Sequence, residues 1–79
     1  MSSIVVEILK MGNTEDPYLM ASFPLYDWEK TEKALWIKQR AIVQASYICK
    51  PNAQLGYDII ISTELSREDQ IEFVLRWGG

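Results

Sequence analysis

The chain has 79 residues, a formal net charge of −3 at pH 7, a single cysteine and no histidine. A chain this short cannot divide into two separately stable cores, so we expect residues 1–79 to form one small α+β domain. The 48% of hydrophobic and 24% of charged residues are typical of a globular protein and exclude a disordered tail. No apolar run approaches the roughly 18 residues of a membrane span, and "MSSIVVEILK" lacks the basic start of a signal peptide. We therefore expect a cytoplasmic location and no membrane partner.

The missing residue types exclude most kinds of catalytic and metal site. Without histidine, zinc sites of the Cys/His type and Ser–His–Asp or Cys–His catalysis are ruled out. The four glycines, at 12, 56, 78 and 79, do not form a phosphate-binding loop. Adjacent acids such as Glu15 and Asp16 are typical of solvated caps. We expect no enzyme, no metal, no cofactor and no small-molecule ligand. Cys49 is either a small buried hydrophobe or a reactive thiol.

The first third of the chain predicts two strands. "IVVEILK" (4–10) is rich in β-branched residues and alternates in part, which favours a strand. "MGNTEDP" (11–17) has the composition of a turn. "YLMASF" (18–23) is interpreted as a second strand that ends at Pro24, since proline cannot donate to a sheet.

A helix is predicted next, over residues 28–41. Asp27 is a good N-cap, and Glu29 follows in the first turn, where the helix dipole favours negative charge. On this helix Trp28, Thr31, Leu35 and Ile42 form one stripe that is expected to face the core. The far end is less defined, because "AIVQASYICK" (41–50) passes into a strand pattern.

The last third predicts a central strand and an ambiguous C-terminal segment. "PNAQLG" (51–56) is a turn, and "YDIIIST" (57–63) has three consecutive isoleucines suited to a buried strand. Ser66 as a cap and Gly78 as a stop favour a helix over 67–77. The alternation of apolar residues over 71–77 favours a strand instead.

These elements together predict the order ββαββα. We expect an antiparallel sheet of about four strands with two helices on one face, which is the natural layered arrangement for that order. In the alternative, the last segment is a fifth strand in place of the second helix.

Two groups of residues are candidates for contact with a partner. In the predicted helix, Ile37 lies roughly 180° from the apolar stripe, so it would be exposed among cations. The alternative is that the helix ends early and Ile37 turns inward. In the C-terminal segment acidic residues recur every four positions and would form one row on a helix, a pattern that is also typical of a solvated face. The candidate interaction residues are Lys33, Trp36, Ile37, Arg40, Glu64, Glu68, Asp69 and Glu72.

Three classes of function follow, in decreasing order of support. The first is a small non-enzymatic protein–protein interaction or regulatory module whose partner is another protein or a second copy, because tryptophan and tyrosine are favoured interface anchors. The second is an acidic inhibitor that mimics nucleic acid and blocks a nucleic-acid-binding protein, of the kind that a phage or mobile element encodes. Direct nucleic-acid binding is disfavoured by the sequence pI near 4.8.

Overall fold

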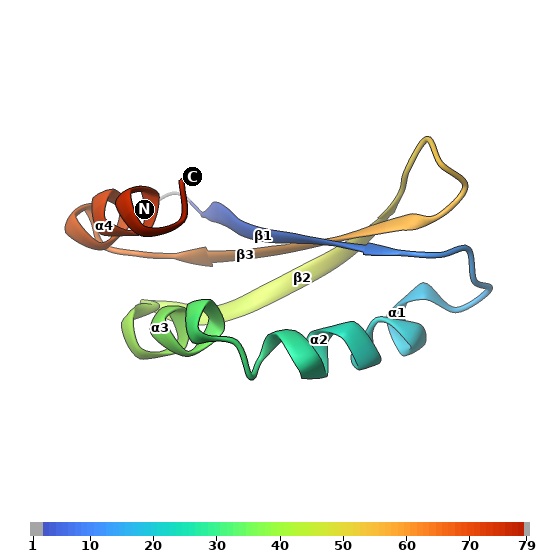
Figure 1. Ribbon diagram of the computed structural model, residues 1–79, viewed down its shortest axis with the longest axis horizontal. Helices are drawn as coiled ribbons and strands as arrows, with labels where there is room; N and C mark the ends of the chain where they lie inside the picture. Colours follow the sequence, from blue (N-terminus) through green and yellow to red (C-terminus); the bar gives the residue numbers. More distant parts are fainter. Residues whose placement is uncertain (1–2, 79) are drawn as a thin grey trace.

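The computed structural model describes residues 3–78, which form a three-stranded antiparallel sheet flanked by helices (Figure 1). The α+β class is therefore confirmed, but the order of elements differs from the predicted one. In chain order the elements are β1 (Ile4–Met11), α1 (Pro17–Met20), α2 (Ser22–Trp28), α3 (Glu32–Arg40), β2 (Val43–Pro51), β3 (Tyr57–Glu64) and α4 (Arg67–Trp77).

The last strand of the chain, β3, is the middle strand of the sheet. The spatial order is β1-β3-β2, and β3 pairs antiparallel with both neighbours. Its isoleucines explain the position: Ile59 and Ile61 are 0% and 2% exposed, as expected for a strand with neighbours on both sides. The strand predicted over 57–63 is thus confirmed, and it offers no free edge.

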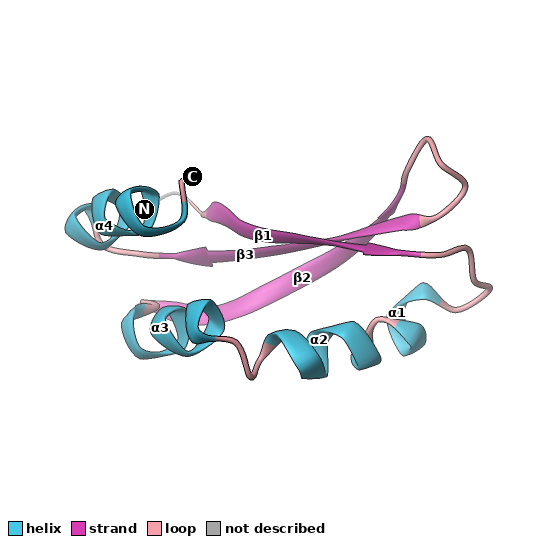
Figure 2. Ribbon diagram, viewed as in Figure 1, coloured by secondary structure: helices cyan, strands magenta, loops and turns pink. Residues whose placement is uncertain are grey.

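The sheet has one covered face and one open face. Figure 2 shows a strongly twisted sheet with α1, α2 and α3 running beside it and α4 at the end where β3 stops. On the covered face, Ile59 and Ile61 pack with Val6, Ile37, Leu65 and Phe73 to form the core. Neighbouring strand residues point to opposite faces, so the residues between them line the other side. We call this side the open face; it carries Val5, Ile8, Ser46, Ile48, Ile60 and Ser62.

The strand predicted over 18–23 is wrong, because this segment forms α1 and α2. Asp16 caps the first of these helices, since its Oδ1 accepts a hydrogen bond from the backbone N–H of Leu19 at 3.2 Å. Pro17 occupies the first helical position, where a missing N–H costs nothing. Pro24 lies in the first turn of α2, where it is tolerated for the same reason. The sheet consequently has three strands instead of four.

The helix predicted over 28–41 is also placed wrongly. Asp27 lies inside α2, which ends at Trp28, and the chain turns before α3 begins at Glu32. Thr31 is the N-cap of α3: its Oγ1 accepts a hydrogen bond from the backbone N–H of Ala34 at 3.2 Å. The break at 29–31 resets the helical phase, so the stripe that joined Trp28 to Leu35 does not exist.

This change of phase reverses the predicted exposure of two residues. Ile37 is 1% exposed and belongs to the core, whereas Leu35 is 51% exposed. The prediction of an exposed Ile37 is therefore wrong. Ile37 does turn inward, but because the helix begins late at Glu32 and not because it ends early, since α3 continues past Ile37 to Arg40. On the short α3, Ala34 and Ile37 lie one turn apart on the side that packs against the sheet.

At the C-terminus the helix interpretation is confirmed and the strand alternative is wrong. Ser66 caps α4, with its Oγ accepting a hydrogen bond from the backbone N–H of Asp69 at 3.2 Å. Gly78 ends the helix with a left-handed φ of 71°, a conformation that glycine adopts without a Cβ clash. Phe73 is the buried residue of this helix, and Leu75 on its outer side is 80% exposed.

Candidate interaction surfaces

The residues predicted as a contact patch on the first long helix instead join α3 to α4. Trp36 is 7% exposed, and its indole Nε1–H donates a hydrogen bond to Glu72 Oε2 at 3.2 Å. Its ring packs edge-on against Trp77 with centroids 5.2 Å apart, and Phe73 lies within 6.5 Å of it. An aromatic cluster thus holds the two helices together, which leaves Trp36 little surface for a partner.

The cations of the predicted patch are engaged in the same way. Arg40 stacks on Trp36, with its guanidinium carbon 4.6 Å from a ring centroid, and its Nε lies 3.6 Å from Asp69 Oδ1. Lys33 Nζ lies 3.4 Å from Glu7 Oε1 on β1. These side chains therefore link α3 to α4 and to the sheet, and a role for them in binding stays a prediction.

The four acidic candidates do not form one row. The row requires a helix that includes Glu64, but α4 begins at Arg67, so Glu64 ends β3. Glu68 is exposed in the first turn of α4. Asp69 and Glu72 are paired with Arg40 and Arg76, and this pairing reduces the negative charge that the helix presents. An acidic inhibitor function stays a prediction that this arrangement does not favour.

The helices α1 and α2 carry a different surface, which is apolar and exposed. Leu19, Phe23 and Tyr26 follow one another at helical spacing and are 62%, 66% and 61% exposed. On the opposite side of the same segment, Ala21 is fully buried and Leu25 packs against the core. A helical segment that is apolar on both sides normally has both sides covered. We call the exposed side, formed by Leu19, Phe23 and Tyr26, the outer face of α1–α2.

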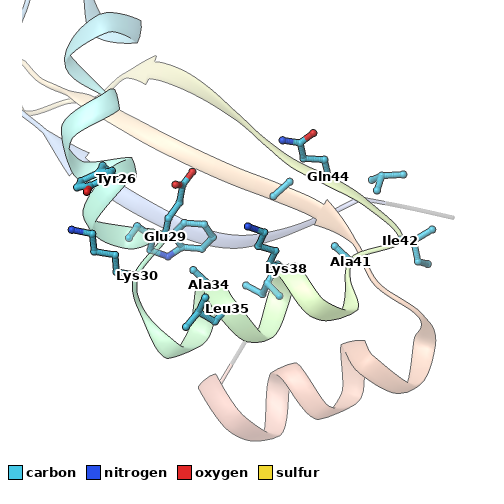
Figure 3. A pocket seen from close by; sticks show the side chains of 13 residues that line it. Tyr26, Glu29, Lys30, Ala34, Leu35, Lys38, Ala41, Ile42 and Gln44 are labelled. Atoms are coloured by element: carbon cyan, nitrogen blue, oxygen red, sulfur yellow. The ribbon is translucent and has the colours of Figure 1, made fainter.

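A groove begins beside this face, between β2 and the helices α2 and α3 (Figure 3). Its volume is about 550 Å³. The buried Ala34 and Ile37 lie among its lining residues, and Tyr26 connects the groove to the outer face of α1–α2. The other lining residues are Trp28, Glu29, Lys30, Leu35, Lys38, Ala41, Ile42, Val43, Gln44 and Ala45.

Small side chains and a strand irregularity explain the hollow. Ala34, Ala41 and Ala45 provide only methyl groups where β2 leaves α3. The register of β2 against β3 also shifts between Val43 and Ser46, so the start of β2 is not held flat on the sheet. The groove is therefore built by the fold, with apolar walls that include the half-exposed Leu35, Ile42 and Val43.

The charges around these two features differ. Residues 15–29 contain four acidic residues and no basic one, and all four are exposed: Glu15, Asp16, Asp27 and Glu29. Lys30 and Lys38 line the groove, and Lys30 Nζ lies 4.0 Å from the ring centroid of Tyr26. The outer face of α1–α2 thus lies in an acidic segment, while the groove next to it is lined by two cations and by Glu29 of that segment.

Cys49 behaves as a packing residue. Its Sγ lies 3.8 Å from the backbone carbonyl oxygen of Pro17, and partial burial raises the pKa of its thiol. A raised pKa disfavours the thiolate, which is the nucleophilic form. Within residues 3–78 no group of three or more metal-binding side chains is found, and no helix of that range is long and apolar enough to cross a membrane.

The surface on α1–α2 was missed because a strand was predicted there. The signal that would have found it is the pair Asp16–Pro17, an N-cap followed by proline at the first helical position. Read as a helix, residues 17–28 are apolar almost all round, which is the sequence signature of a segment covered on both sides.

Comparison of the chain with protein-family models, with curated proteins and with solved structures gives no match.

Proposed function

We propose that this protein is a small non-enzymatic interaction module that binds an apolar segment of another protein. The observation that supports this most strongly is the outer face of α1–α2, where Leu19, Phe23 and Tyr26 are each more than 60% exposed. Scattered apolar residues on a surface are ordinary, but a continuous helical face of them is typical of a protein contact site.

The groove next to this face provides a pocket for a side chain of the partner. Aromatic and aliphatic anchors contribute most to binding when they enter a pocket that excludes water. Here an apolar side chain of the partner can enter between β2 and α3, while its neighbours lie on Phe23 and Tyr26. Helix-in-groove recognition uses this combination of a ridge and a recess.

The acidic charges of residues 15–29 favour a partner of one chemical class. The four exposed carboxylates within residues 15–29 attract lysine or arginine and repel phosphate. We therefore expect the bound segment to be an amphipathic helix whose apolar stripe is flanked by basic residues. The same charges disfavour nucleic acid and anionic lipid at this face.

A binding experiment with designed peptides tests this proposal. A fluorescent peptide of about 15–20 residues, with a Leu/Phe stripe and lysine flanks, is titrated with the protein and followed by anisotropy. The controls are a scrambled peptide and one with glutamate flanks. We expect saturable binding of the first peptide alone.

Two matched variants locate the binding surface. Phe23→Glu should weaken binding of the lysine-flanked peptide by about tenfold or more, because it places a charge in the apolar contact. Leu75→Glu changes a residue that is 80% exposed on α4 and should change the affinity by less than about twofold. Equal effects of the two variants, or equal binding of all three peptides, would contradict the proposal.

A further inference from the structure

We infer that the open face of the sheet is a weak homodimer interface. In this dimer two copies stack face to face, and each strand runs in the opposite direction to the same strand of the other copy. This inference goes beyond the proposed function and names a second copy of the chain as a partner. It concerns a different surface from the outer face of α1–α2, so the two can be tested separately.

The open face carries an apolar row across all three strands. Ile8 and Ile48 are the register partners of Ile60 on its two sides. Ile8 is 49% and Ile48 is 46% exposed, and Val5 in the next row is 52% exposed. Ile60 on the central strand is partly exposed as well. An antiparallel sheet normally places polar residues on a face that meets water, and this one places isoleucines there.

The edges of the sheet are less suited to self-association than its face. On β2, the backbone N–H of Cys49 donates a hydrogen bond to the phenol oxygen of Tyr18 at 3.2 Å, so α1 already occupies part of that edge. On β1, the register against β3 shifts between Val5 and Glu7. Covered edges and bulges both hinder strand addition. We therefore expect a second copy to contact the isoleucines of the open face by stacking on that face, and not by adding a strand at an edge.

Two symmetric face-to-face stackings are possible, with the same strand of the two copies running antiparallel or parallel. The charges on the open face favour one of them. At one end, Asp58 has Lys10 and Lys50 as its register partners, which gives this end a formal charge of +1. At the other end, Glu64 pairs in register with the uncharged Val43, which gives −1. Among the described residues Lys50 and Glu64 form no ion pair.

A two-fold axis perpendicular to the strands places the lysine end of one copy over the Glu64 end of the other, and each end of the dimer is then neutral. An axis parallel to the strands instead gathers both lysine ends together and both Glu64 side chains together. Like charges brought together disfavour that arrangement. The antiparallel stacking is therefore the self-complementary one, as a two-fold interface requires.

The size of the face predicts a weak dimer. Three strands of about eight residues cover roughly 26 Å by 14 Å, or roughly 370 Å² on each copy. This is less than half of the roughly 800 Å² per partner in a stable complex. The sheet is strongly twisted (Figure 2). Two twisted faces touch over a smaller area than two flat ones, so we expect the contact to centre on the row of Ile8, Ile48 and Ile60. We expect a dissociation constant on the order of 100 µM.

Sedimentation equilibrium from about 10 µM to about 1 mM tests the interface. The wild type should pass from monomer to dimer over this range. Ile48→Glu should remove the dimer, while Ile71→Glu, at an isoleucine of similar exposure on α4, should leave it intact. Circular dichroism checks that both variants are folded. A wild type that stays monomeric, or a dimer that survives Ile48→Glu, would overturn the inference.

Charge reversal tests the orientation and needs no change in the apolar contact. In the antiparallel dimer Glu64→Lys gives each end a charge of +2, and Lys50→Glu gives each end −2. Each change should weaken dimerisation by roughly two- to tenfold, and the double variant, with neutral ends, should restore it. In the parallel stacking neither single change alters the repulsion. Equal dimerisation of all four proteins would therefore overturn the antiparallel arrangement. A monomeric protein that still binds the lysine-flanked peptide would overturn this inference alone.

Discussion

Trp36 and Glu72 lie 36 residues apart in the chain and are joined by a hydrogen bond from the indole Nε1 to the carboxylate Oε2 at 3.2 Å. This bond crosses between α3 and α4 next to the contact between Trp36 and Trp77. It fixes the orientation of a large aromatic side chain that is almost completely buried. Residues that the sequence presents as a charged surface are therefore a contact between two helices.

The contribution of that hydrogen bond can be measured with a double-mutant cycle. Trp36→Phe keeps an aromatic ring but removes the donor, and Glu72→Ala removes the acceptor. We expect a coupling free energy of about 1 kcal/mol between the two changes, measured from urea unfolding. Glu68→Ala, at an exposed acid of the same helix, should show no coupling to Trp36→Phe. Identical coupling for both acids would contradict the role of Glu72.

The phase of α3 is tested by truncating two neighbouring apolar residues. Ile37→Ala should lower the free energy of unfolding by about 2–5 kcal/mol, since it leaves a cavity in the core. Leu35→Ala should lower it by less than about 1 kcal/mol, because Leu35 is half exposed. The comparison uses chemical denaturation of the two variants under one set of conditions. A larger loss for Leu35→Ala would show that the helix has the phase expected from the sequence.

The start of α3 can be located through its cap. Thr31→Ala removes the acceptor of the Ala34 N–H and should cost about 1 kcal/mol of stability. Asp27→Ala should have little effect, because Asp27 lies inside α2. The measurement is again the free energy of unfolding. If Asp27→Ala costs more than Thr31→Ala, the helix begins at residue 28 and not at residue 32.

Acid should weaken the turn end of the sheet through Asp58. The hydrogen bond from the Asn52 side chain, followed by that from Lys10, lowers the pKa of Asp58 below 3.8. A carboxylate whose pKa is lower in the folded than in the unfolded state stabilises the fold at any pH above its unfolded pKa. This stabilisation is lost as the pH falls through the folded-state pKa. We therefore expect the urea midpoint of the wild type to fall more steeply below pH 3.8 than that of Asp58→Asn.

Asn52→Ala provides the control for this pH dependence. It removes the first cause of the lowered pKa, so part of the acid-sensitive stabilisation should already be absent at neutral pH. Urea midpoints measured across the acid range compare the three proteins. A profile of Asp58→Asn that runs parallel to that of the wild type would show that Asp58 does not contribute.

Periodicity alone predicts the first and last strands, β1 and β3. The β-branched runs that form β1 and β3 are long enough to identify, and the three isoleucines identify β3 as central. The helix α4 is identified by its capping residues, Ser66 and Gly78, although the alternation of apolar residues favours a strand. Local capping chemistry was the more informative signal there.

The errors come from short helices. The predicted strand over 18–23 contains leucine, methionine and aromatic residues, which suit a strand or a helix equally over so few positions. The helix predicted from Asp27 crosses a break that has no proline or glycine to mark it. Once Thr31 instead of Asp27 is the cap, the phase changes, so that Ile37 lies in the core and Leu35 at the surface. Apolar surface left uncovered on α1–α2 and on the sheet depends on tertiary packing, which periodicity does not contain.

The most direct measurement is a dilution series of ¹H–¹⁵N correlation spectra of the wild type, from about 1 mM to about 20 µM. If the open face joins two copies, concentration-dependent shifts should concentrate at Ile8, Ile48, Ile60 and their strand neighbours. Titration of the lysine-flanked peptide into the dilute sample should instead shift Leu19, Phe23 and Tyr26. Spectra that change with neither concentration nor peptide would contradict the interpretation of the uncovered apolar surface as a binding surface.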